Sequence, residues 1–125
     1  MTPSDRSLEA VVAAVLAVNR YPLEKAWELL PPLRKAGLTR PEKVIGTDIG
    51  VLTVALAKAG YNRGLLTEMM AGRLQALMAA VQAGTLDRLD ALVAAAKRDE
   101  AVASLREVRG IGPQVAANAL ALLEG

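Results

Sequence analysis

The sequence lacks several residue types, and each absence removes a class of function. It contains no cysteine, so disulfides, iron–sulfur clusters and thiolate chemistry are excluded. It contains no histidine, which excludes catalysis by a histidine acid or base and histidine-rich metal sites. Aromatic side chains are limited to Tyr21, Trp27 and Tyr61. Any site must therefore be built from backbone groups and from aliphatic, amide, hydroxyl and charged side chains.

Long apolar runs and targeting segments are missing as well. The longest apolar run, residues 10–18, is too short to cross a bilayer, and Asp5 and Glu9 before it argue against a signal peptide. The sequence shows no paired carboxylates, no phosphate-binding P-loop and no cluster of metal ligands. We therefore expect a cytoplasmic protein with no membrane partner.

Small and aliphatic residues dominate what is present. The chain has 125 residues, of which 53% are hydrophobic, and this length fits one domain with one core. A composition rich in alanine and leucine and poor in aromatics favours packed helices over a β-sandwich. The net charge of +2 permits a nucleic-acid partner without arguing for one. We predict a single all-α domain over residues 1–125.

Apolar residues recur at helical spacing, and proline, glycine and capping residues divide the pattern. Ser4 or Ser7 is expected to cap the first helix, Thr39 a later one, Thr47 or Asp48 the next, and Asp99 the helix before the last. The apolar stripe of the longest helix, with its methionines, is interpreted as core. The pattern predicts a compact bundle of about six to eight short helices, placed at residues 4–20, 22–30, 40–46, 48–59, 65–83, 85–97, from 99 to the turn, and 113–123, with a helical turn at 33–36.

The most informative stretch is residues 105–123, LREVRGIGPQVAANALALL. Gly110 and Gly112 permit positive φ and close approach of the backbone to a ligand. Pro113 suits the first position of a helix, where its missing N–H costs nothing. The turn would leave the N–H groups of Gly110, Gly112 and Gln114 unpaired at a helix N-terminus. Such amides bind an anion, most simply a phosphate.

These residues resemble a helix-hairpin-helix motif, whose hairpin grips the backbone of DNA without reading bases. The motif would span residues 99–124, and the alternative is a tight corner between two helices in which both glycines serve only packing. The resemblance also implies a Na⁺ or K⁺ ion at the carbonyl groups of Val108 and Ile111. The residues expected to contact the DNA backbone are Arg106, Arg109, Gly110, Ile111, Gly112 and Gln114.

The order of the helices is similar to more than one motif. Residues 7–123 resemble the six-helix barrel of the endonuclease III-type, or HhH-GPD, DNA glycosylases. An apolar helix ends in an amide residue, Asn19, and a Gly-aromatic loop around Tyr61 and Arg63 precedes a long helix. In that family the amide lies close to the DNA lesion. The resemblance therefore implies that Asn19, Tyr61 and Arg63 lie near DNA.

The departures from that family bear on catalysis. Gln114 stands where bifunctional members carry a catalytic lysine, and a glutamine cannot form a Schiff base. The family's aspartate after the second hairpin helix, its iron–sulfur cysteines and its second domain have no counterpart up to Gly125. No catalytic lysine or aspartate is identified. We therefore expect a non-catalytic protein that binds double-stranded DNA without sequence specificity.

Two alternatives remain open. The first is a minimal glycosylase that a partner subunit or a second copy completes with the missing aspartate and cleft wall. The second is a protein–protein interaction module, or a homodimer, that uses the face which the family's second domain would cover. Exposed apolar surface of several hundred Å² usually marks such an interface.

Overall fold

The computed structural model describes residues 3–124, and this part of the chain consists of nine α-helices with no β-strand. This confirms the all-helical prediction. None of the helices in this part is long and apolar enough to cross a membrane. The helices are α1 (Asp5–Leu16), α2 (Leu23–Glu28), α3 (Leu30–Lys35), α4 (Pro41–Ile45), α5 (Ile49–Lys58), α6 (Leu65–Gln82), α7 (Leu89–Ala94), α8 (Arg98–Arg106) and α9 (Pro113–Glu124).

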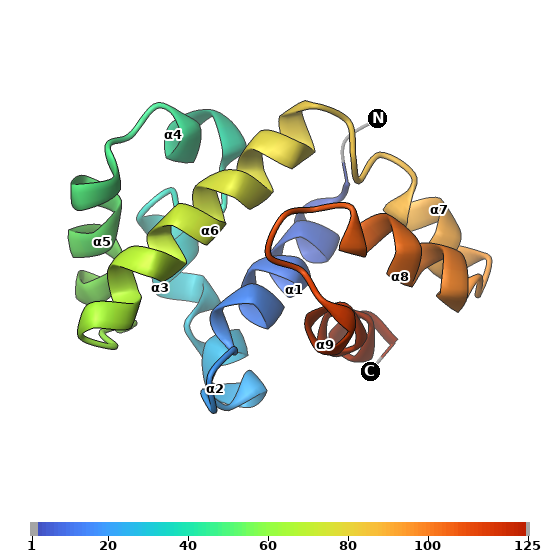
Figure 1. Ribbon diagram of the computed structural model, residues 1–125, viewed down its shortest axis with the longest axis horizontal. Coiled ribbons are helices and arrows are strands. Elements are labelled where there is room, and N and C mark those ends of the chain that lie inside the picture. Colours follow the sequence, from blue (N-terminus) through green and yellow to red (C-terminus); the bar gives the residue numbers. More distant parts are fainter. Residues whose placement is uncertain (1–2, 125) are drawn as a thin grey trace.

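Helix α1 runs through the middle of the molecule (Figure 1). From Ser7 to Leu16 every residue except Glu9 is buried. A helix that is apolar on all sides is stable only when neighbours cover all of it. Helix α9 packs along α1, and α2 and α6 also contact it. The core is therefore centred on α1.

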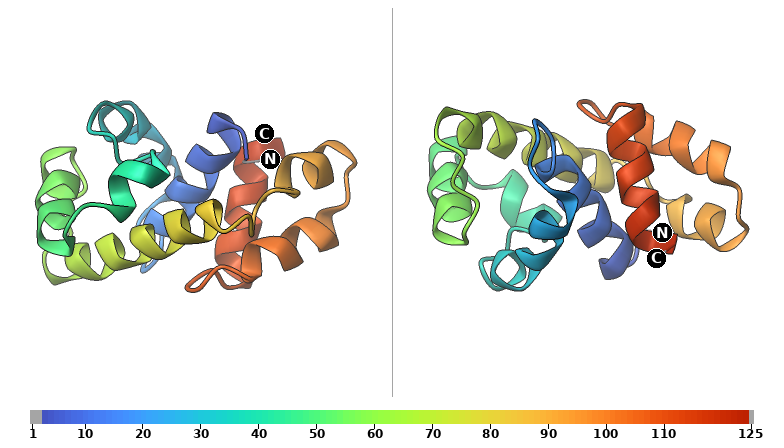
Figure 2. Two further views of the ribbon diagram at one scale, coloured as in Figure 1. Left: turned by 90° about the horizontal axis from the view of Figure 1, so that it is seen from above. Right: turned by 90° about the horizontal axis from the view of Figure 1, so that it is seen from below.

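The remaining helices form two groups on either side of α1 (Figures 1 and 2). Helices α4 and α5 pack against α6, whereas α7 and α9 pack against α8. The long α6 connects the groups, since it begins beside α5 and ends near α7. Met70 and Met78 of α6 are fully buried as expected, but Met69 is 40% exposed, so its assignment to the core was wrong.

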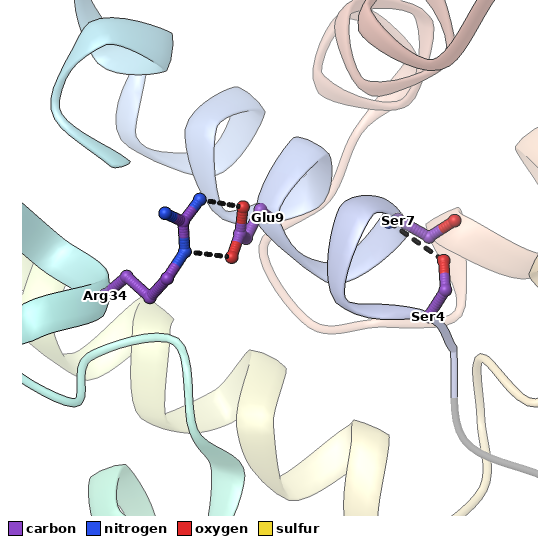
Figure 3. A network of polar contacts seen from close by, with 4 residues as sticks. All are labelled: Ser4, Ser7, Glu9 and Arg34. Carbon is purple, nitrogen blue, oxygen red and sulfur yellow. Dashed lines mark hydrogen bonds and ion pairs between the residues drawn. The ribbon is translucent and has the colours of Figure 1, made fainter. Parts of the chain in front are cut away.

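Polar contacts hold the N-terminal half of α1 in place. Ser4 caps α1 as predicted, with its Oγ accepting a hydrogen bond from the Ser7 amide at 3.2 Å (Figure 3). Asp90 accepts hydrogen bonds from the Ser4 amide at 2.7 Å and from the Ser7 hydroxyl, which ties α7 to the start of α1. Arg34 of α3 makes a two-pronged ion pair with Glu9, at 2.8 and 2.7 Å (Figure 3).

Several helices begin at a proline or next to one. Helix α1 ends at Leu16, before the predicted end at residues 19–20, and Pro22 is the N-cap of α2 and not its first residue. The helix predicted at 22–30 ends at Glu28, and a separate helix, α3, begins at Leu30 with Pro31 and Pro32 in its first turn. The first turn tolerates proline because its N–H groups need no partner within the helix.

Several predicted caps also move by a few residues. Asp48 caps α5 as expected and accepts a hydrogen bond from the Gly50 amide at 2.9 Å. Arg40, and not Thr39, is the N-cap of α4, because Pro41 at the next position fixes the start. The helix predicted at 85–97 is only Leu89–Ala94, and Ala96 adopts φ +57° after it. Lys97 consequently replaces Asp99 as the N-cap of α8.

Candidate nucleic-acid interface

The turn between α8 and α9 has the form of a helical hairpin. Leu105, Val108 and Ile111 are buried on its inner side. Gly110 has φ +93°, a conformation that residues with a Cβ rarely adopt. Gly112 does not have positive φ, so the expectation that both glycines serve that purpose holds only for Gly110.

Gly112 is open to the outside. A Cβ built on this residue would meet no atom of residues 3–124 within 4 Å. The protein itself therefore imposes no steric requirement for glycine at this position. Because Gly112 has no side chain, a ligand can approach the backbone closely at this position.

The hairpin amides are available for a ligand. The Ile111 amide donates to the Val108 carbonyl at 3.1 Å and the Ala116 amide donates to the Gly112 carbonyl at 3.0 Å. The amides of Gly110, Gly112 and Gln114 donate to no atom of residues 3–124. They lie at the N-terminus of the 12-residue helix α9. Free amides at a helix N-terminus carry partial positive charge and suit an anion.

Arg73 of α6 reaches this hairpin although nothing in the sequence pattern pointed to it. Its Nη1 donates to the Gly110 carbonyl at 3.3 Å, and its side chain lies under Gly110. The guanidinium group is only partly used by this contact and has further N–H donors. Only the packing of α6 reveals this residue, because it lies far from the hairpin in sequence.

The hairpin and α6 together enclose a shallow hollow of about 420 Å³. Arg73 and Arg109 line this hollow. Gly72 and Gly110 also line it, and they add no side chain to its wall. Arg106 and Arg109 are exposed and pair with no acid of residues 3–124, whereas Glu107 lies between them in the chain. The surface is thus a positively charged hollow beside free amides, lined by Met69, Gly72, Arg73, Ala76, Arg109 and Gly110.

Asn19, Tyr61 and Arg63 lie close together in the structure, and the hydrogen bonds between them and the end of α1 hold the fold. Tyr61 is fully buried and its hydroxyl donates to the Leu16 carbonyl at 2.7 Å. Arg63 donates to the carbonyls of Val18 and Asn19, both at 2.6 Å. These bonds satisfy carbonyl groups after the end of α1. The Tyr61 ring is therefore part of the core, and the exposed Asn19 stands in the left-handed region at φ 58°. The position of these residues near DNA stays a prediction.

Tyr21 completes this cluster. Its ring lies 5.1 Å from that of Tyr61, between centroids, and the Arg63 guanidinium carbon lies 5.2 Å from the Tyr21 centroid. Its hydroxyl is buried and has no hydrogen-bond partner in the part of the chain described here. Burial raises the pKa of Tyr21 above its usual 10.0, against an opposing effect of Arg63. Burial likewise raises the pKa of Tyr61, and Arg63 again opposes the shift.

Both tyrosines are expected to ionise above pH 10.0. The folded chain holds these phenol protons more tightly than the unfolded chain. The resulting stabilisation is complete below pH 10.0 and is lost as the pH rises through the folded-state pKa values. Phenolate absorbance and urea unfolding across alkaline pH measure this. Ionisation at the ordinary pKa with unchanged stability would contradict the burial of the cluster.

No three of the Asp and Glu residues in the described part of the chain lie close enough to hold a metal ion. Glu124, at the end of α9, pairs with Arg98 at 2.8 Å. The Val108 carbonyl accepts one hydrogen bond, from Ile111, and the Ile111 carbonyl accepts none from residues 3–124. These two oxygens therefore retain lone pairs that suit a monovalent cation.

Comparison of the chain with protein-family models, with curated proteins and with solved structures found no match. The assignment of function therefore starts from the hairpin and its surroundings.

Proposed function

We propose that this chain binds the phosphate backbone of double-stranded DNA through the hairpin between α8 and α9. The observation that carries the proposal is the set of free amides at Gly110, Gly112 and Gln114, beside a hollow that is lined by Gly110, Arg73 and Arg109. Amides and guanidinium groups are the usual protein donors to phosphate oxygens. The resemblance of residues 105–116 to the helix-hairpin-helix motif supports the same conclusion, as does the similarity of the helix order to the six-helix barrel of HhH-GPD glycosylases.

The contacts proposed here give position and no sequence preference, because phosphate groups are the same at every base pair. Arg106 adds charge from the end of α8, and Ile111 anchors the hairpin from its buried side. A Na⁺ or K⁺ ion held by the carbonyls of Val108 and Ile111 would add a further positive charge. Affinity for duplex DNA is expected on the order of 10⁻⁴ to 10⁻⁶ M at physiological salt.

Catalysis is not part of the proposal. The alternative of a minimal glycosylase was motivated by Asn19 and by the loop at Tyr61. Tyr61 and Arg63 instead hold the carbonyl groups that follow α1, which explains their presence without a lesion pocket.

The variant Gly112→Ala tests the proposal. The chain has room for the added methyl group, so the fold should remain, but the methyl group would stand where a phosphate must approach. We expect affinity for a labelled duplex to fall about tenfold, as for the loss of one hydrogen bond to a charged group. Fluorescence anisotropy at low and moderate salt measures this.

Gly46→Ala is the matched control. Gly46 is exposed, has no positive φ as Gly112 has none, and would bring its Cβ no nearer than 3.5 Å to another group. This variant should bind DNA as the wild type does. Gly110→Ala is a poor substitute, because φ +93° makes that change strained whether or not DNA binds. Equal affinity of Gly112→Ala and the wild type would refute the hairpin as the binding site.

A further inference from the structure

Helix α5 presents an apolar face that no other part of residues 3–124 covers. Its inner side packs on α6 through Leu52 and Leu56, which are buried. On its outer side Val51 is 58% exposed and Val54 is 53% exposed. These are the largest exposed fractions of any valine in this part of the chain. Branched side chains lower helix propensity slightly, so an exposed helix gains nothing from them unless they are covered.

The exposed face is also short of charge. Ile49–Lys58 contains a single charged residue, Lys58, at its last position. A solvent-facing helix ordinarily carries charged or polar residues along its outer side. Here a shallow groove of about 430 Å³ follows the helix, and it is lined by Asp48, Gly50, Val51, Val54, Ala55 and Lys58.

The charges at the two ends of this face have opposite sign. Asp48 lies at the N-terminal end and Lys58 at the C-terminal end, with the valines between them. Lys58 pairs with no acid of residues 3–124. Two copies of such a face match each other when the helices run antiparallel, because Asp48 of each copy then meets Lys58 of the other. Such self-complementarity is what a two-fold symmetric interface requires.

We propose that α5 is the contact surface of a weak homodimer with antiparallel α5 helices. Pairing Asp48 with Lys58 places the two-fold axis at Thr53, midway between them in sequence. The same register places Val51 opposite Ala55 of the second copy, so that a larger side chain meets a smaller one. The contact is confined to a helix of ten residues. Interfaces below the usual size are weak, so we expect a dissociation constant of the dimer on the order of 10⁻⁵ to 10⁻³ M.

Sedimentation velocity of the full chain without DNA tests this inference over protein concentrations from about 10 μM to about 1 mM. The wild type should pass from monomer to dimer. Val51→Lys should weaken the dimer at least tenfold, because it buries an unpaired charge. Leu65→Lys is the control, since Leu65 is 98% exposed but lies on α6, and it should leave the dimer unchanged.

Charge reversal tests the register. Lys58→Glu and Asp48→Lys each place like charges together at both ends of the interface, so each variant alone should be monomeric at concentrations where the wild type dimerises. Mixed in equal amounts, the two variants regain both opposite-charge pairs and should form a heterodimer. Asp48→Lys also removes the cap on α5. Lys58→Glu does not, so its monomeric state tests the pairing even where Asp48→Lys fails to fold.

Two results would overturn the inference. One is a wild type that stays monomeric at the highest concentration, which would leave the face to another protein. The other is a dimer that Val51→Lys and Lys58→Glu leave intact. The sedimentation experiment contains no DNA and reports only the association of the chain with itself, so its outcome is independent of whether the hairpin binds DNA.

Discussion

The variant Tyr61→Ala is expected to lose about 3–5 kcal/mol of its free energy of unfolding, the usual cost of removing a large buried aromatic side chain. Tyr61 is fully buried between the end of α1 and the start of α6. Its ring packs against Tyr21, and its hydroxyl donates to the Leu16 carbonyl. The substitution therefore removes apolar contact and leaves a buried carbonyl without this donor. Urea unfolding followed by circular dichroism measures the loss.

Tyr61→Phe separates the two contributions. It keeps the ring and removes only the hydroxyl, so it should cost about 1–2 kcal/mol, the penalty of leaving a buried acceptor unpaired. Leu65→Ala is a surface control, since that side chain is 98% exposed, and it should change stability very little. If Tyr61→Ala unfolds within about 1 kcal/mol of the wild type, the ring is not part of the core.

The double variant Arg73→Gln/Arg109→Gln is expected to bind duplex DNA about tenfold to a hundredfold more weakly, at roughly 1 kcal/mol per lost phosphate contact. Both guanidinium groups stand at the hollow beside the hairpin. Each phosphate contact releases about one counterion, so the slope of log affinity against log salt should become shallower by about one per arginine. Anisotropy titrations at several salt concentrations give both values.

A second double variant, Lys35→Gln/Arg40→Gln, controls for the loss of net charge. Both residues are exposed and lie near α3 and α4, away from the hairpin. If this control lowers the affinity and the salt slope as much as the arginine variant does, binding depends on overall charge and the hollow has no special role. Circular dichroism of Arg73→Gln alone shows whether the bond to the Gly110 carbonyl matters for folding.

Local sequence signals predicted the hairpin well. The positive φ of Gly110, the start of α9 at Pro113 and the burial of Leu105 and Val108 all follow from residues within a few positions of one another. The same holds for the Ser4 and Asp48 caps. Short-range preferences decide such features before any tertiary contact forms.

Features that depend on tertiary packing were missed. Arg73 looked like an ordinary helix residue, and only the packing of α6 beside the hairpin brings it to Gly110. The Gly-aromatic loop gave no sign that the Tyr61 hydroxyl would donate to the last carbonyl of α1. The helix predicted at 85–97 is shorter at both ends, and beyond its C-terminal end Ala96 turns into the left-handed region. A periodic apolar pattern cannot report such a break, since alanine fits a helix or a turn.

The most direct test of the hairpin proposal is a ¹⁵N–¹H NMR titration of the chain with a short duplex, repeated with a second duplex of unrelated sequence. We expect the largest shifts on the amides of Gly110, Gly112 and Gln114 and on the Nε–H groups of Arg73 and Arg109, with the same pattern for both duplexes. Shifts concentrated on other helices, or no shift at low salt, would contradict the proposal.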